Sequence, residues 1–448
     1  MNLKNTIKNT DKDSKNVVIN MINTFLVKGG ALVIGLLTTP AYMRFFDNNS
    51  VLGVWYTMLS VLTWVLYFDL GVGNGLRNKL VEAISLKDKD LQKKYISSAY
   101  IFLSGIAIAV AIVLLAVCQF INWNVILNIS QKDLSRHILT KAVAIVLCGI
   151  LLQFVLRLIS SIMYAIQKAF IPNLLSLCTN VIVLVYVLAA NKIGKNNNII
   201  NLSWVYLIAS VLPMFVATVG VFTTTLKDVR PNINYYDKKC ANEVFKTGIG
   251  FLVLQIAGML IGNSFVVYLI TILLNSASVV EFNIYYKIYS NVYMLFSILM
   301  TPIWSAVTKA MADNRFEWIK KMMLKLRAGL ALIFLAQFMM IPIMQFVFDI
   351  WLGDKSIVAN IGTQVAFIIN NGIMMLYLLT AQICNGLGEL KIQVRWMITA
   401  NVMLLVLSFV FTRVMPHYTA VIYAQSIALL PYCIVMTKWL NRRIANPQ

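Results

Sequence analysis

Long apolar runs alternate with short polar segments along most of the chain. About 20 mostly apolar residues suffice for a helix to cross the hydrocarbon core of a bilayer. By this rule the pattern predicts an all-α polytopic membrane protein with twelve transmembrane helices, whose ends are set to within a few residues. The predicted spans are 17–43, 51–69, 95–117, 138–166, 170–190, 203–226, 247–274, 281–305, 328–350, 361–384, 396–414 and 420–438.

The composition supports a membrane protein and argues against other classes of protein. Of the 448 residues, 60% are hydrophobic and 12% are charged, and the mean hydropathy is +0.77, whereas soluble domains are about 25% charged. The net charge of +21 comes from basic residues dispersed between apolar spans, so we expect no nucleic-acid partner. The six cysteines form no CxxC pair, and we expect no disulfide framework, no metal and no cofactor.

The basic residues also predict an orientation. Of the 38 Lys and Arg residues, 27 lie on the side of the two termini, 7 lie on the other side and 4 lie inside spans. Cytoplasmic loops of membrane proteins carry the excess of Lys and Arg. We therefore predict that both termini are cytoplasmic, and an even number of spans fits this.

The polar stretch at 227–246 divides the predicted spans into two sets of six. We predict an N-terminal six-helix bundle (1–226), a cytoplasmic linker (227–246) and a C-terminal six-helix bundle (247–448). A faint repeat agrees with this division, because NVIVLV at 180–185 is similar to NVMLLV at 401–406. Parallel six-helix halves recur among transporters.

A glycine-rich stretch, FDLGVGNGLRNK at 68–79, follows the second span. Glycine weakens a helix interior, so three glycines at alternate positions predict a bend where the helix leaves the membrane. One interpretation is a capped cytoplasmic connector. The other is a basic, amide-rich entry or gate for an anionic lipid head group. Its candidate residues are Asp69, Gly71, Gly73, Asn74, Gly75, Arg77 and Lys79.

Four cations fall inside predicted spans: Lys28, Lys141, Arg157 and Lys287. A charge there costs about 2.5–3.5 kcal/mol on insertion scales and usually faces a cavity. We interpret them as a substrate pathway, with Arg157, Lys28 and Lys287 as successive stations for an anion. The alternatives are that Lys141 snorkels to the surface, and that Lys287 snorkels or pairs with a carboxylate.

Catalytic chemistry is not indicated. The loops are short, and no span carries paired carboxylates, an HExxH motif or a Ser/His/Asp set. We therefore predict that the protein is not an enzyme. A membrane-bound polysaccharide polymerase, the rival from another class, is expected to need a larger outer loop than the longest ones here, at 118–137 and 191–202.

Three local motifs resemble those of a known family. The stretch FDLGVGNGLRNKLVEA, the segment TPIWSAVTKA at 301–310 and CNGLGELK at 384–391 are similar to the same regions of Wzx-type O-antigen flippases. These belong to the multidrug/oligosaccharidyl-lipid/polysaccharide exporter superfamily. The related drug exporters often use a buried carboxylate in the first helix, where this chain has Lys28 and no acid.

The resemblance implies two six-helix bundles around a cationic central cavity that works by alternating access. It implies flipping of undecaprenyl-diphosphate-linked oligosaccharide from the cytoplasmic to the periplasmic leaflet of the bacterial inner membrane. Expected partners are membrane lipid, H⁺ or Na⁺ as coupling ion, and polysaccharide polymerase and chain-length proteins. Alternative substrates are another lipid-linked precursor (capsule or teichoic acid) or, with less support, drugs.

Overall fold

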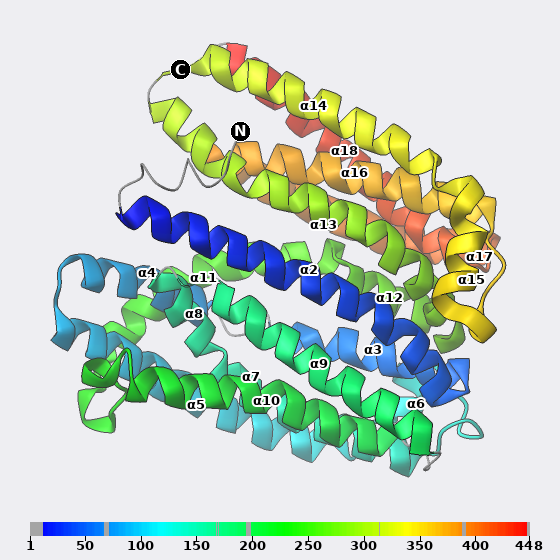
Figure 1. Cartoon of the computed structure of the whole chain (residues 1–448), viewed down its shortest axis with the longest axis horizontal. Coiled ribbons are helices and arrows are strands. Elements are labelled where there is room, and N and C mark those ends of the chain that lie inside the picture. The colour runs from blue at the N-terminus through cyan, green and yellow to red at the C-terminus, as the bar shows by residue number, and fades with distance from the viewer. Residues whose placement is uncertain are drawn as a thin grey trace. The chain divides into compact units, whose positions relative to one another are not determined.

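The computed structural model describes residues 12–66, 71–166, 168, 170–193, 199–312, 314–387 and 391–445. Within these ranges the regular secondary structure is helical (Figure 1). The chain forms two compact units. Unit 1 comprises residues up to 47 together with 61–125 and 130–255, and unit 2 comprises 48–60, 126–129 and the residues from 256.

Unit 1 is a bundle of long helices with short connectors. In it α2 packs beside α9, and α10 packs against α7 and α9. Its helices are α2 (Lys12–Phe46), α4 (Val72–Ser85), α5 (Lys89–Cys118), α7 (Arg136–Leu156), α8 (Leu158–Ala165), α9 (Phe170–Ile193), α10 (Ile199–Thr223), η2 (Lys227–Val229), η3 (Ile233–Tyr235) and most of α11 (Lys238–Ile261).

Unit 2 is a second bundle, in which α16 packs against α13, α14 and α18. Its helices are the first part of α3 (Asn49–Val65), α12 (Asn263–Leu273), α13 (Ser276–Ala312), α14 (Phe316–Phe338), η4 (Ile341–Ile343), α15 (Met344–Leu352), η5 (Gly353–Lys355), α16 (Ile361–Gly386), α17 (Lys391–Val414) and α18 (Thr419–Ala445). The short α6 (Trp123–Ile126) lies where the chain passes from unit 1 to unit 2.

Large apolar side chains cover much of the outside of both bundles. Ile112 in α5 is 66% exposed, and Leu332 in α14 is 70% exposed. Such surfaces would drive a soluble protein to associate, but they suit helices in contact with lipid. In the described ranges, nine helical segments are long and apolar enough to cross a membrane. The chain is a multi-pass membrane protein, and the count of twelve stays a prediction.

Three predicted spans differ in form from simple long helices. The predicted span 138–166 is interrupted at Arg157, between α7 and α8, and the predicted span 247–274 is interrupted at Gly262, between α11 and α12. The predicted span 328–350 divides into α14, η4 and α15. Of the predicted linker, residues 238–246 are helical, because the carboxylate of Asp237 accepts the amide hydrogens of Lys239 and Cys240 at 2.7 and 3.1 Å and begins α11.

The glycine-rich stretch is helical and not a bend from Val72 onward, which corrects the sequence prediction. Within the described part of the stretch, residues 71–79, Gly71 alone has the left-handed conformation, with φ of 69°, and it directly precedes α4. The helix forms because Val72, Leu76 and Leu80, spaced four residues apart, are buried against α5 and α8. Burial of this apolar face outweighs the low helix propensity of glycine.

Candidate functional site

Arg157 lies at the junction of α7 and α8. Its amide donates to the Gln153 carbonyl at 2.8 Å, as in an α-helix, but its own carbonyl accepts from the Ser160 amide at 2.9 Å. This three-residue hydrogen bond tightens the chain locally. The Arg157 side chain is exposed, and it lines a polar pocket within unit 1.

The pocket encloses about 140 Å³. It brings together Arg157 and residues of the glycine-rich stretch, which the sequence treated as separate candidates. Among the residues that the structure describes, no carboxylate lines it. The described lining residues are Leu66, Gly73, Asn74, Arg77, Phe154, Arg157, Leu158, Ser160, Ser161 and Tyr164.

The charge of the pocket comes from two guanidinium groups. Arg77 comes from α4, and its guanidinium carbon lies 5.2 Å from the centroid of the Tyr164 ring of α8. A cation over an aromatic face is held by the ring quadrupole while its N–H donors stay free for a ligand. Two guanidiniums with the amide of Asn74 and the hydroxyls of Ser160 and Ser161 form a donor-rich pocket suited to a phosphate or carboxylate.

The glycines of α4 serve two different surfaces. Gly73 lines the pocket. Gly71 and Gly75 face α11, where a β-carbon would lie 2.0 Å from the carbonyl oxygen of Gly248 or Val244, respectively. The alternation therefore allows close contact of two helix backbones on one side of α4 and leaves room beside the arginines on the other.

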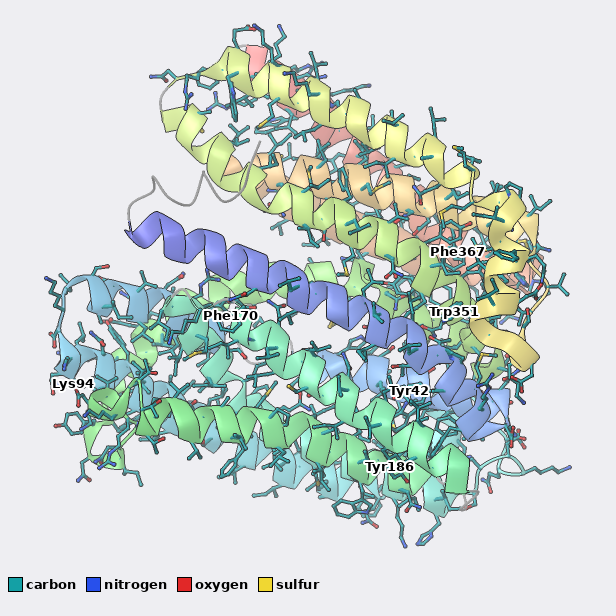
Figure 2. All side chains as sticks on the ribbon, in the orientation of Figure 1. Tyr42, Lys94, Phe170, Tyr186, Trp351 and Phe367 are labelled. Carbon is teal, nitrogen blue, oxygen red and sulfur yellow. The ribbon has the colours of Figure 1, made fainter. Side chains whose placement is uncertain are left out.

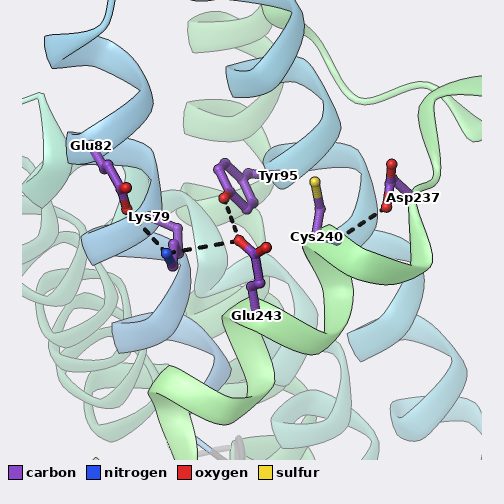
Figure 3. A network of polar contacts seen from close by, with 6 residues as sticks. All are labelled: Lys79, Glu82, Tyr95, Asp237, Cys240 and Glu243. Carbon is purple, nitrogen blue, oxygen red and sulfur yellow. Dashed lines mark hydrogen bonds and ion pairs between the residues drawn. The ribbon is translucent and has the colours of Figure 1, made fainter.

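Lys79 takes part in a different set of contacts, shown in Figure 3. Its ammonium lies 3.0 Å from Glu82 Oε2 and 3.7 Å from Glu243 Oε2, and the hydrogen bond to Glu82 raises the pKa of Lys79. The Tyr95 hydroxyl donates to the same oxygen of Glu243 at 2.6 Å. Lys79 is thus balanced by carboxylates, whereas the pocket that Arg77 lines has none among its described lining residues.

The remaining predicted pathway residues do not line this pocket. Lys28 in α2 and Lys287 in α13 are half-buried, and Lys141 in α7 is exposed. None of these three lysines forms an ion pair with another described residue. Asp69 lies outside the described residues, so its role stays a prediction.

Sequence reasoning missed a second cavity, which lies within unit 2. Asn263, Tyr286, Tyr289, Tyr293 and Asn370 line it, and none of them was among the predicted site residues. A signal was present, because the three tyrosines recur at helical spacing and Asn370 lies within an apolar run.

Comparisons with known proteins place the fold. No family model matches the chain, and no curated protein matches it. Among solved structures, the chain is similar to an inward-facing multidrug resistance MATE family transporter of the MOP superfamily, with a TM-score of 0.75 and 13% identity over 92% of this chain and 94% of that chain.

Two further structures have related folds. The lipid II flippase MurJ, in an inward closed conformation, matches with a TM-score of 0.68 and 15% identity over 95% of this chain and 87% of that chain. A MOP superfamily transporter from Pyrococcus furiosus, titled for the reverse polarity of its binding pocket, matches with a TM-score of 0.60 and 14% identity over 96% of both chains. The three are described as transporters or as a flippase, and this chain has the fold of MOP-superfamily transporters.

Proposed function

We propose that this protein is a flippase for lipid-linked saccharides whose head group is anionic. The observation that carries the proposal is the convergence of Arg77 and Arg157 on one pocket, with no carboxylate among the described residues that line it. Arginine binds phosphate oxygens through two parallel N–H donors. A diphosphate that links a sugar to a polyprenyl chain presents several such oxygens, and its lipid tail can stay in the bilayer.

The specific substrate in this proposal is an undecaprenyl-diphosphate-linked O-antigen unit, moved from the cytoplasmic to the periplasmic leaflet of the bacterial inner membrane. The proposal includes twelve spans in two six-helix bundles, cytoplasmic termini and alternating access. Lys28, Lys141 and Lys287 are proposed as further stations of the pathway. Asp69 and the segment from Gly71 to Lys79 are proposed as the cytoplasmic entry and gate, and H⁺ or Na⁺ as the coupling ion.

The cationic pocket reduces the free-energy cost of moving an anion through a low-dielectric region, since Coulomb attraction grows as the dielectric constant falls. No covalent chemistry is needed for this. Polysaccharide polymerase and chain-length proteins are proposed partners, because they would receive the flipped unit.

A second candidate is a multidrug exporter, which the name of the MATE-family structures favours. The pocket of unit 1 argues against cationic drugs, because its two guanidinium groups, with no carboxylate among the described lining residues, repel a cation. Precursors of capsule or teichoic acid remain alternatives of the same chemical class, since they also carry phosphate on a lipid.

The test is flipping of a fluorescent undecaprenyl-diphosphate saccharide in proteoliposomes. We compare the wild type with Arg77→Gln and Arg157→Gln, and use Arg230→Gln, at an exposed position outside the pocket, as the matched control. Hydrogen bonds to charged groups contribute about 1.5–3 kcal/mol each. We therefore expect each pocket variant to flip about tenfold to a hundredfold more slowly, and the control to flip at the wild-type rate.

Wild-type rates in both pocket variants would remove the pocket from the mechanism. No flipping by the folded wild type, together with export of a cationic dye, would favour the multidrug alternative.

A further inference from the structure

The second cavity lies within unit 2 and encloses about 60 Å³. Helices α12, α13, α16 and α18 contribute its walls, and Figure 2 labels Phe367, which comes from α16. None of the described residues that line the cavity carries a charged side chain. They are five aromatic residues, four amides and three others: Phe282, Tyr286, Tyr289, Tyr293, Phe367, Asn263, Asn370, Asn371, Gln425, Ser290, Met374 and Ile422.

The cavity lies at the interruption between α11 and α12. Gly262 is extended there, with φ of −71° and ψ of 164°, and no side chain caps the following helix. Asn263, the first residue of α12, keeps its Oδ1 buried without a hydrogen-bond partner among the described residues. Interrupted helices at membrane depth occur where backbone lines a cavity or lies within protein, and in transporters they mark binding sites.

The amides of the cavity direct their N–H groups into the protein. Asn370 Nδ2 donates to Gln425 Oε1 at 3.0 Å. Asn371 Nδ2 donates to Gln337 Oε1 at 2.6 Å. Gln425 Nε2 donates to the Ile261 carbonyl at 2.7 Å, beside the helix interruption. The amide oxygens of Asn263, Asn370 and Asn371 therefore remain as acceptors for a ligand that donates hydrogen bonds.

The aromatic residues add flat apolar walls and two hydroxyls. The Phe282 and Tyr286 rings stack with centroids 5.7 Å apart, and so do those of Tyr289 and Phe367. Among the described residues, no hydrogen bond engages the hydroxyl of Tyr286 or of Tyr293, while that of Tyr289 donates to Gln364. A sugar matches this arrangement, because its hydroxyls donate to amide oxygens and its C–H face packs on aromatic rings.

We propose that this cavity binds the hydroxyl-bearing edge of an uncharged sugar. A water occupies at least about 10–15 Å³ by this kind of measure, so the cavity has room for about four waters or the hydroxyl groups of one ring edge. The proposal rests on the proposed function in one respect, that the sugar is part of the lipid-linked substrate.

A cationic ligand fits less well. No carboxylate is among the described residues that line the cavity. The half-buried Lys287 of α13, one residue from Tyr286, has no ion-pair partner in the described part of the chain. Its positive charge disfavours a second cation nearby. An anion fits less well too, because no arginine or lysine is among the lining residues.

The test is binding of methyl glycosides of glucose, galactose, mannose and N-acetylglucosamine to the purified full-length protein in nanodiscs. Saturation-transfer NMR and thermal stabilisation provide the two readouts. The double variant Tyr286→Phe with Tyr293→Phe keeps both rings and removes both hydroxyls. Tyr377→Phe, in the same unit but outside the cavity, is the matched control, and tetraphenylphosphonium and NaCl are the competing probes.

We expect at least one glycoside to bind the wild type and Tyr377→Phe, with affinity about tenfold lower for the double variant. The proposal would be overturned if the wild type bound tetraphenylphosphonium or sodium but no glycoside, and if the double variant lost that binding. It would also be overturned by absence of all binding by folded wild type, or by glycoside binding that the double variant retains. Because this assay measures no flipping, it reports on the cavity even where the lipid-flipping experiment fails.

Discussion

At the scale of the residue, Arg157 and Arg77 show what the sequence supplies and what it does not. An arginine in the middle of an apolar run is recognisable as functional, because its insertion into a membrane is costly. Its proximity to Arg77, eighty positions earlier, is not recognisable, since it depends on how α4 packs against α8. The two arginines were therefore assigned separate roles, and only the fold unites them in one pocket.

We predict that Arg157→Lys weakens binding of inorganic pyrophosphate to the purified protein by about tenfold. Lysine keeps the charge but loses the planar pair of donors, and about 1.4 kcal/mol corresponds to a tenfold change. Isothermal titration at low and moderate salt measures this. Arg230→Lys, at an exposed position in the connector between η2 and η3, is the control. Equal affinity of Arg157→Lys and wild type would argue against bidentate contact.

A second prediction concerns Asp237, which caps α11. Hydrogen bonds from the backbone amides of Cys240 and Lys239 hold its pKa below the usual value. Because the folded pKa is lower than the unfolded one, the ionised carboxylate stabilises the fold above about pH 4, and this contribution is lost as pH falls through the folded pKa. Asp237→Ala should cost about 1 kcal/mol at pH 7.

The measurement is thermal unfolding of the wild type, Asp237→Ala and Asp237→Asn at pH 7 and pH 3. Asparagine caps a helix without titrating, so Asp237→Asn should stay close to the wild type at pH 7. The difference between the wild type and Asp237→Ala should shrink at pH 3. A gap of the same size at both pH values would show that the carboxylate charge does not contribute.

At the scale of the element, the hydrophobic pattern predicted the positions of most helices but did not predict where helices are interrupted. Burial in a bilayer needs only a long apolar run, which the sequence displays directly. A break such as that at Gly262 leaves the run apolar, so it is invisible to the same rule. The α4 helix was missed because its glycines favour a bend when only the sequence is considered. Their role in the helix becomes clear only from their contact with the α11 backbone.

We predict that Gly75→Ala lowers the melting temperature, whereas Gly105→Ala does not. A β-carbon at Gly75 would lie 2.0 Å from the Val244 carbonyl oxygen, but one at Gly105 in α5 meets no atom within 4 Å. Overpacking costs about 1–3 kcal/mol, while alanine in place of an unhindered helical glycine gains up to about 1 kcal/mol. Unfolding followed by the fluorescence of a detergent-solubilised sample compares the two. A stable Gly75→Ala protein would mean that α4 and α11 are farther apart than described.

At the scale of the whole molecule, the apolar runs correctly predicted a multi-pass helical membrane protein, and the fold comparison agrees. The number of spans is harder to derive. The predicted spans 51–69, 247–274 and 281–305 correspond to α3, to α11 with α12, and to α13. These helices are not among the nine apolar segments found in the described residues. Single cysteines report on topology directly, because an impermeant thiol reagent reaches only one face of the membrane.

We predict that Lys132→Cys reacts with an impermeant maleimide on intact spheroplasts, and that Lys227→Cys reacts only after permeabilisation. Both lysines are exposed, and the Lys and Arg distribution places them on opposite faces. The variants are made in a background without the six native cysteines. Labelling of both cysteines on intact spheroplasts would contradict the odd number of predicted spans, three, that separates Lys132 from Lys227.

The division into two units has a consequence for how the chain is assembled during synthesis. Unit 2 includes residues 48–60, where Thr57 bonds to Thr271 at 2.6 Å. The last segment of unit 1 extends to residue 255 and includes the part of α11 that contacts α4. Neither half of the polypeptide therefore completes a unit alone. Unit 1 closes only after α11 has emerged from the ribosome, so two fragments cut near residue 231 should accumulate when co-expressed and be degraded when made singly.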